Sequence, residues 1–345
     1  MGCSRMVSTN SRRTLYFSAP GKIEIQEGEL PSPGPEQVLV KTLLSGISAG
    51  TEMLLYRGQF PAGIPVDESI PELSDDFSYP LKYGYALVGK VIETGAGVDP
   101  AWVGRRIFAF HPHESHFTSG LEELHPVPNG VSDEDAVFLA NMETAVNLLL
   151  DSRPMMGERA VVFGQGIVGL LTTALLARFP LSCLVALDGY AMRRELSLEL
   201  GANASLDPAF PGLQRQIKEL LQTEADLVFE LSGIPEVLNQ AIDITGYSGR
   251  IVIASWYGKK RAEIDLGGRF HRNRIHLISS QVSSLAPEYS GRWDKARRFQ
   301  VAWEMLRKIR PSKFITHRFP LEQAGDAYRL LDEKPSEAIQ VVFTY

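Results

Sequence analysis

One glycine pattern in the sequence has the spacing needed to bind phosphate groups. Gly164, Gly166 and Gly169 follow the apolar run 160–163 and open a predicted helix over 167–179. We expect Gly164 to allow a tight turn, Gly166 to let the backbone approach a pyrophosphate, and Gly169 to let helix and strand pack closely. The free N–H groups and positive dipole end of such a helix attract phosphate oxygens. The predicted site also includes Gln165, Ile167 and Val168.

An acidic residue stands where a dinucleotide would place its ribose. Asp188 ends the next predicted strand, 24 positions after Gly164. A carboxylate there accepts hydrogen bonds from the adenosine ribose and repels a 2′-phosphate, so the pattern predicts a dinucleotide site that prefers NAD to NADP. Arg193 and Arg194 follow closely and could soften this preference, which leaves NADP possible, or could lie on a solvated helix face. A glycine-rich turn without a ligand is the alternative to the whole site.

The elements around this motif have the pattern of a parallel sheet. Apolar runs alternate with helical stretches from residue 133 onward, which is typical of strands buried on both faces by helices. The chain before this point has short β-type runs separated by Gly and Pro, which predicts a mainly β domain. Residues 1–13 are expected to fray, and residues 60–80 to form a surface excursion or lid. The predicted strands of the sheet are 159–163, 184–187, 226–231, 250–254 and 275–278.

Composition limits the class of protein. The 345 residues suit two domains, and 35 basic against 41 acidic residues give a net charge of −6, which argues against nucleic-acid binding through a basic domain. Two cysteines, Cys3 and Cys183, cannot form a disulfide framework or a four-cysteine zinc lobe. No run of 18 apolar residues predicts a membrane span, and no signal peptide is recognised, so a cytoplasmic protein is expected.

Several segments together resemble the medium-chain dehydrogenase/reductase family, from Thr14 to Tyr345. The resemblance implies an α/β protein in which a GroES-like, mainly β catalytic domain (1–141 and 284–345) is split around a Rossmann dinucleotide-binding domain (142–283). It also implies an active site in the cleft between them. Family members are usually dimers or tetramers, and we expect a homodimer. The segments are 41–58 (KTLLSGISAGTEMLLYRG), 80–94 (PLKYGYALVGKVIET), 103–108 (VGRRIF), 229–233 (FELSG), 249–252 (GRIV) and 317–324 (HRFPLEQA).

The chain departs from the family pattern at the zinc ligands. The first active-site loop, which carries a Cys in zinc-dependent members, reads SAGTE over 48–52, and their Gly-His-Glu is Gly84-Tyr85-Ala86. The third ligand falls near Ala140 or Asn141, and the structural zinc loop is missing. These residues cannot supply a zinc site, so we predict a zinc-independent member with no metal. Residues 45–52 look closest to the bacteriochlorophyllide a dehydrogenase-like branch, whose members oxidise a hydroxyethyl group on a large ring.

The resemblance also suggests catalytic residues. Thr51 matches the hydroxyl residue that relays the alcohol proton, and is expected to bind the substrate unless it only satisfies a turn. Tyr85 matches a zinc-ligand position and could donate a proton, or only fill the space of the metal. Glu52 matches an acidic residue beside the zinc ligands and could be a base or, more simply, a structural partner.

A histidine cluster adds a second candidate. His111, His113 and His116, with Glu114 among them, could bind a metal or act as acid and base. Their alternative is an ordinary role as surface histidines on a strand exit. His111, nearest the strand end, is the best of the three for catalysis, so the hypothesis is that Tyr85 or His111 donates the proton.

Further cofactor contacts are expected from hydroxyl residues. Thr144 matches the family's nicotinamide-facing Thr, and Ser232, Ser255 and Ser280 follow predicted Rossmann strands, where cofactor contacts arise. The function favoured is a zinc-independent NAD(P)-dependent oxidoreductase of the alcohol dehydrogenase type. It would transfer hydride to or from a small-molecule alcohol or carbonyl substrate, with a bulky compound among the candidates. An NAD(P)H-dependent quinone or enone reductase and a non-catalytic dinucleotide-binding protein remain alternatives.

Overall fold

The computed structural model describes residues 11–61 and 77–345, and the chain forms two compact units. The first unit comprises Met1–Val137, His317–Asp332 and Val341–Tyr345, and the second comprises Phe138–Thr316 and Glu333–Gln340. The borders therefore differ from the predicted ones at 141 and 284, because the stretch 284–316 belongs to the second unit.

One helix pair explains the shifted border. Helix α8 (Lys295–Ile309) packs on α3 (Leu139–Ser152), and the buried Arg298 of α8 donates to Glu143 Oε1 at 2.6 Å and to Asn147 Oδ1 at 2.7 Å. A buried charge is stable only when it is paired, so this contact ties α8 to the helix that opens the second unit.

The second unit contains a six-stranded parallel sheet in the order β10-β9-β8-β11-β12-β13. In chain order this is 3-2-1-4-5-6, the doubly wound Rossmann arrangement, so the predicted parallel sheet is confirmed. The strands are β8 (Arg159–Phe163), β9 (Cys183–Leu187), β10 (Ala204–Leu206), β11 (Ala225–Glu230), β12 (Thr245–Ile253) and β13 (His276–Ser279).

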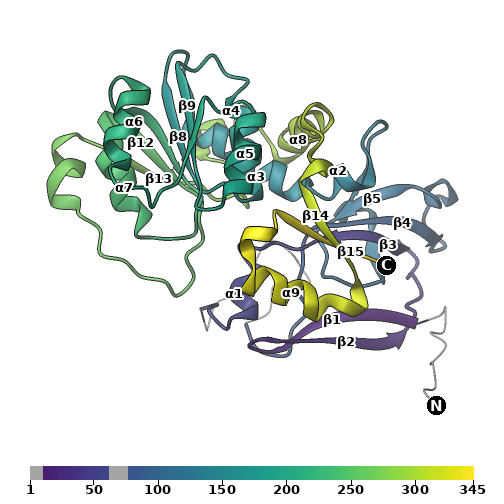
Figure 1. Cartoon of the computed structure of the whole chain (residues 1–345). Helices are drawn as coiled ribbons and strands as arrows, with labels where there is room; N and C mark the ends of the chain where they lie inside the picture. Colours follow the sequence, from purple (N-terminus) through teal and green to yellow (C-terminus); the bar gives the residue numbers. More distant parts are fainter. Residues whose placement is uncertain (1–10, 62–76) are drawn as a thin grey trace. The chain divides into compact units, whose positions relative to one another are not determined.

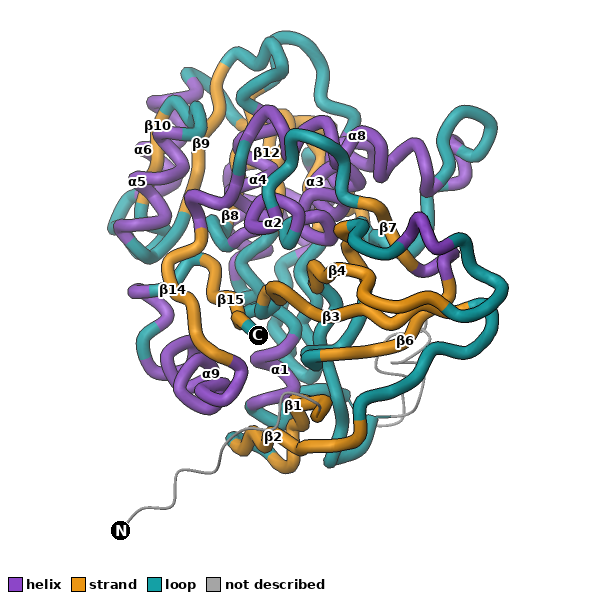
Figure 2. The backbone as a smooth tube through the Cα atoms, turned by 90° about the vertical axis from the view of Figure 1, so that its right-hand side faces the viewer, coloured by secondary structure: helices purple, strands orange, loops and turns teal. Residues whose placement is uncertain are grey.

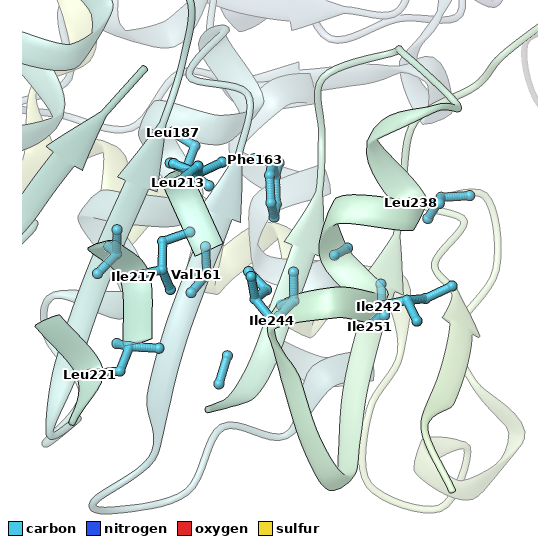
Figure 3. Close-up of a cluster of buried hydrophobic side chains, with 14 of the residues drawn as sticks. Val161, Phe163, Leu187, Leu213, Ile217, Leu221, Leu238, Ile242, Ile244 and Ile251 are labelled. Carbon is cyan, nitrogen blue, oxygen red and sulfur yellow. The ribbon is translucent and has the colours of Figure 1, made fainter. Parts of the chain in front are cut away.

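Helices cover both faces of this sheet (Figure 1). On one face, α6 (Leu213–Leu221) and α7 (Val237–Ile244) bury apolar side chains against β8, β9 and β12 (Figure 3). On the other face, α3 and α4 (Ile167–Leu176) contribute Leu148 and Leu176 to a second cluster, and α5 (Ala191–Glu199) packs beside α4. Two closely packed hydrophobic cores hold the strand ends in fixed positions, and the predicted cofactor-binding residues lie at those ends.

The first unit is mainly antiparallel β structure. Its larger sheet runs β14-β15-β3-β4-β5-β7, with β6 also pairing with β3. Val40, Val91 and Ile107 are among the buried side chains that form its core. The strands are β3 (Gln37–Gly46), β4 (Leu87–Thr94), β5 (Arg106–Ala109), β6 (His116–Gly120), β7 (Leu124–Pro126), β14 (Ile315–Pro320) and β15 (Gln340–Thr344).

A separate strand pair and two helices complete the first unit. Strands β1 (Ser11–Ala19) and β2 (Lys22–Glu29), with helices α1 (Glu52–Tyr56) and α9 (Ala324–Glu333), lie on one side of β3 (Figure 2). Tyr328 of α9 packs edge-on against Phe17 of β1 and stacks on Tyr56 of α1. These ring contacts fix α9 over the loop that follows β3.

Three local expectations require comment. Residues 11–13, expected to fray, belong to β1, because they pair with β2. The sequence pattern of residues 133–150, with Ser132 before them as a cap, indicates one helix, but the structure breaks it into α2 (Asp133–Ala136) and α3. Ser132 caps α2 by accepting from the Asp135 N–H at 3.0 Å. Most of the predicted excursion at 60–80, and residues 1–10, lie outside the described residues. Within the described ranges, no helix is long and apolar enough to cross a membrane.

Candidate active site and dinucleotide site

The glycine turn between β8 and α4 has a geometry that only glycine permits at two positions. Gly164 has a φ of 87°, and a Cβ there would lie 2.6 Å from the backbone carbon of Leu231. A Cβ on Gly169 would lie 1.9 Å from the carbonyl oxygen of Gly164. These contacts explain the turn and the close helix packing that the spacing predicted.

The third glycine differs, because it faces open space. A Cβ on Gly166 would meet no atom within 4 Å, and no side chain caps the N-terminus of α4 that follows. Ile167 and Val168, the first residues of α4, therefore directly follow a position that is open. An open backbone at a helix N-terminus fits a pyrophosphate.

Asp188 lies directly beside this turn. Its Oδ2 accepts from the Gln165 N–H at 2.7 Å and its Oδ1 accepts from the Tyr190 N–H at 2.8 Å, and the side chain is buried. Each carboxylate oxygen can accept more than one hydrogen bond, so the Asp188 carboxylate can still accept from a ribose diol. Gln165 adds only backbone to the site, because its amide turns inward to Val162 and Thr173.

The two arginines after Asp188 already have partners. Arg193 donates to the carbonyls of Pro335 and Ala338 at 3.1 and 3.0 Å and lies over the ring of Tyr190. Arg194 donates to the Asp188 carbonyl at 2.8 Å and lies 3.5 Å from Asp207. Both are half-buried, so neither is on the freely solvated helix face that was the alternative.

Two of the predicted serines also lie near the glycine turn. The Cα of Ser232 would be 2.7 Å from a Cβ on Gly164, and the hydroxyl of Ser255 accepts from the Gly233 N–H at 2.9 Å. Sequence reasoning missed Glu230, the buried last residue of β11, although an acidic residue ending an apolar run was the available signal. Glu230 accepts from Ser232 and, at 2.6 Å, from Tyr257, whose pKa is raised by burial and by this carboxylate.

The other two hydroxyl residues predicted to bind the cofactor, Thr144 and Ser280, form hydrogen bonds elsewhere. Thr144 donates to the Ala140 carbonyl at 3.0 Å inside α3, and Ser280 donates to Asp151 Oδ2 at 2.6 Å. Burial raises the pKa of Asp151. No recorded contact among the described residues joins these two hydroxyls to the glycine turn, so their cofactor role remains a prediction.

In the first unit, a pair of hydroxyl groups stands on the loop after β3. Tyr85 donates a hydrogen bond to the Oγ of Ser48, and both side chains are half-buried. The Ser48 N–H donates to Glu52 Oε1 at 2.7 Å. Sequence reasoning listed Tyr85 and Glu52 but passed over Ser48, whose only signal was its place in the quoted active-site loop. Thr51, on the same loop, is half-exposed and does not cap α1.

Beneath this pair lies a fully buried polar chain. Glu52 and His113 are both 0% exposed, with Glu52 Oε2 at 3.1 Å from His113 Nε2. The hydroxyl of Tyr328 donates to the same carboxylate, and burial together with Glu52 raises the pKa of Tyr328. On the other side of the ring, His113 Nδ1 lies 2.7 Å from the Oγ of Ser45, which is 2.7 Å from the hydroxyl of Tyr345.

Two members of the histidine cluster, His111 and His113, are buried and are therefore not surface histidines. His111 is buried, its Nε2 lies 2.6 Å from Glu114 Oε1, and its ring stacks on Phe117. Burial raises the pKa of Glu114, but the His111 hydrogen bond and charge, with Lys82, outweigh it and hold this pKa below its usual value. His111 and His113 therefore pair with different carboxylates, Glu114 and Glu52.

The donor set does not fit a zinc ion. No group of three His, Cys, Asp or Glu side chains is gathered to hold a metal within residues 11–61 and 77–345. At the family's ligand positions, Tyr85 and Ser48 are hydrogen-bonded to each other, and Ala140 lies in α3 without a ligating atom. We therefore derive no step through a metal.

Comparison with known proteins identifies the family. A family model described as zinc-binding dehydrogenase matches residues 168–300. The (R,R)-butanediol dehydrogenase of Bacillus subtilis (strain 168) is 31% identical over 291 residues, which cover 76% of this chain and 81% of that protein. The chain belongs to the zinc-binding dehydrogenase family of medium-chain dehydrogenase/reductases. The predicted family membership is thereby confirmed.

Other relatives and solved structures agree with this assignment. The starvation-sensing protein RspB of Escherichia coli (strain K12) is 23% identical over 370 residues, covering 96% of this chain and 99% of RspB. The crystal structure of 2R,3R-butanediol dehydrogenase from Bacillus subtilis has a TM-score of 0.80 at 22% identity and covers 97% of this chain and 100% of that one. The predicted fold, a Rossmann domain with a mainly β domain, is confirmed. The chain is an oxidoreductase of the alcohol dehydrogenase type.

Proposed function

We propose that this protein transfers hydride between NAD and an alcohol or carbonyl substrate without a zinc ion. The observation that carries the proposal is the Tyr85–Ser48 hydrogen bond, which stands where zinc-dependent members place metal ligands. A relative named (R,R)-butanediol dehydrogenase and another named sorbitol dehydrogenase, from Halalkalibacterium halodurans, support a substrate with a secondary alcohol.

The second unit would hold the cofactor. The backbone of the turn at Gly166 and the start of α4 would bind the pyrophosphate, and Asp188 would accept from the adenosine ribose. Asp188 supports NAD over NADP, because its carboxylate would repel a 2′-phosphate, while Arg193 and Arg194 are held by carbonyl and carboxylate partners. When bound, the nicotinamide supplies the hydride acceptor or donor.

The first unit would handle the proton. Tyr85 donates into the Oγ of Ser48, and a hydroxyl has one hydrogen of its own to give, so the Ser48 hydrogen is directed away from Tyr85. In carbonyl reduction, Ser48 would release this proton to the substrate oxygen while Tyr85 passes its own proton to Ser48 and regains one from water. Alcohol oxidation would run the same transfers in reverse.

Two sequence candidates remain as alternatives in this scheme. Thr51 could bind the substrate oxygen, since its half-exposed side chain does not cap α1. His111 could donate the proton, but its Glu114 hydrogen bond and its stacking on Phe117 support a structural role instead.

The finer predictions on substrate and assembly rest on the sequence. The likeness of residues 45–52 to the bacteriochlorophyllide a dehydrogenase-like branch supports a bulky hydroxyethyl compound as one substrate to test. A homodimer is supported by β13, the terminal strand of the six-stranded sheet, whose residues His276 and Leu277 are exposed. A cytoplasmic location stays a prediction from the sequence.

The test combines metal analysis with an absorbance assay at the reduced-nicotinamide band. We expect purified protein with far less than stoichiometric zinc to reduce NAD with secondary alcohols, including 2,3-butanediol and a bulky 1-arylethanol. A stoichiometric zinc whose removal abolishes turnover would refute the zinc-independent mechanism. Reduction of quinones or enones without alcohol oxidation would favour the reductase alternative, and NAD binding without turnover on any class would favour the non-catalytic one.

A further inference from the structure

The buried pair formed by Glu52 and His113 lies directly behind the Ser48–Tyr85 hydroxyl pair. Neither buried side chain is exposed to solvent, whereas both hydroxyl residues are half-buried. We propose that Glu52 and His113 are positioning residues that hold the two hydroxyls in the alignment needed for proton transfer. This inference rests on the proposed function of the same site.

Glu52 acts on Ser48. Its Oε1 accepts from the Ser48 N–H at 2.7 Å, and its own N–H donates to the Ser48 carbonyl at 2.8 Å. Both backbone groups of Ser48 are thus bound to one residue. The Oγ of Ser48 can then change direction only by rotation about χ1, and the hydrogen bond from Tyr85 opposes that rotation.

His113 acts on the segment that carries Tyr85. Its N–H donates to the Tyr83 carbonyl at 3.1 Å. Gly84 has a φ of 133°, and a Cβ there would lie 2.9 Å from the His113 nitrogen and 3.0 Å from its Cδ2. The backbone before Tyr85 therefore rests on His113 without space for a side chain between them.

The carboxylate of Glu52 joins the two halves of this arrangement. It accepts from the Ser48 N–H and the Tyr328 O–H, and it lies 3.1 Å from His113 Nε2. An amide at position 52 has one acceptor oxygen and one NH₂ group, so it cannot accept from both the Ser48 N–H and the Tyr328 O–H through different atoms. In Glu52→Gln, therefore, either the Ser48 N–H or the Tyr328 O–H loses its acceptor, and we expect this change to loosen the support of the hydroxyl pair.

A second buried histidine–carboxylate pair provides a matched control. His111 and Glu114 are also buried and paired, but the Glu114 carboxylate binds His111 and Thr14, at 2.6 and 2.9 Å, whereas the Glu52 carboxylate binds the Ser48 N–H. If Glu52 only stabilised the fold, Glu52→Gln and Glu114→Gln would have the same consequences for the reaction. If it positions the hydroxyls, they will differ.

The experiment compares both variants in full-length protein with NAD and 2,3-butanediol, or with whichever alcohol of the panel the wild type oxidises. For Glu52→Gln we expect kcat to fall by about 10- to 100-fold, as small misplacements of reacting groups do. The KM for NAD should not change, and the solvent deuterium isotope effect on kcat should rise because proton transfer becomes slower. Glu114→Gln should keep the wild-type isotope effect.

A second measurement does not depend on turnover. Hydrogen–deuterium exchange should accelerate in peptides covering residues 46–52 and 83–86 in Glu52→Gln, but not in Glu114→Gln. If the wild type oxidises no alcohol, the proposed function fails while this exchange arm still tests the positioning role. Tyr328→Phe, which keeps its ring contacts and loses one donor to Glu52, should move both readouts in the same direction by less.

The result that overturns the inference is equally definite. The inference is overturned if both Glu52→Gln and Tyr328→Phe keep the isotope effect and the exchange pattern of the wild type. Equal changes in Glu52→Gln and Glu114→Gln would also overturn it, because they would reduce Glu52 to a general contributor to stability.

Discussion

Removal of the Tyr85 hydroxyl separates the chemical role of this side chain from its structural one. In Tyr85→Phe, the ring keeps its place beside Tyr83, with centroids 6.1 Å apart and planes at 86°. Only the O–H that donates to the Oγ of Ser48 is lost. The substitution therefore removes the hydrogen bond to Ser48 and keeps the aromatic ring in its place.

The two roles predict effects of different size. A net intramolecular hydrogen bond contributes about 0.5–1.5 kcal/mol to stability, so the variant should unfold at only slightly lower denaturant concentration. A positioned proton donor contributes about 10²- to 10⁴-fold to rate, which corresponds to about 2.7–5.5 kcal/mol of the activation barrier. The loss in kcat should thus exceed anything that the loss in stability explains.

The assay measures kcat for alcohol oxidation, NAD binding by calorimetry and urea unfolding on the same preparations. NAD affinity should stay unchanged, because the proposed cofactor residues belong to the second unit. Tyr79→Phe is the matched control, since the Tyr79 hydroxyl donates only to the backbone carbonyl of Leu55. A Tyr85→Phe enzyme that turns over as fast as the control would show that Tyr85 is not the proton donor.

Three further predictions concern the cofactor site and the second histidine–carboxylate pair. Asp188→Ala should weaken NAD binding by about 10- to 100-fold, the value of a charge-assisted hydrogen bond, and reduce the preference over NADP; equal losses for both cofactors in calorimetry would contradict the ribose contact. Gly166→Val should leave thermal stability intact, because a Cβ there meets nothing within 4 Å, yet prevent NAD binding, and normal binding would disprove the pyrophosphate assignment. Glu114→Gln should cost about 1.5–3 kcal/mol of unfolding free energy at pH 7. The pKa of Glu114 in the folded protein lies below its usual 4.5, so the difference in unfolding free energy between wild type and variant should persist above pH 4.5. It should vanish as the pH falls through the folded pKa. A difference that stays constant with pH in urea unfolding would show that the charge of Glu114 does not contribute.

The glycine turn of the proposed dinucleotide site could be predicted from the sequence because its parts are local. Gly164, Gly166 and Gly169 lie within one turn, and the apolar strand before them predicts where that turn stands. The steric reasons found in the structure match the expected ones, with two glycines that exclude a Cβ and one that faces open space. The position of Asp188 beside the glycine turn could also be predicted, because parallel strands end at the same edge of a sheet and so bring their terminal residues together.

The hydrogen-bond partners of the predicted hydroxyl groups could not be predicted from the sequence in the same way. Ser48 and Tyr85 are 37 positions apart, and Tyr328 contacts Glu52 across 276 positions. The family resemblance placed both segments at the lost zinc site, but it did not indicate which side chains bond, since these contacts depend on strand pairing and on the packing of α9. The prediction that favoured His111 over His113 could not foresee that the two rings bond to different carboxylates.

Residue types and spacing were enough to predict the two-domain class and the parallel Rossmann sheet, because alternating apolar strands and helices can be recognised from short stretches of the chain. The absence of a zinc ion stays a prediction. The fold itself was needed to decide which hydroxyls meet and which carboxylate supports them. Glu52 is one of 41 acidic residues in the sequence. It becomes distinctive only in the folded chain, where burial removes water and leaves Ser48, His113 and Tyr328 as its partners.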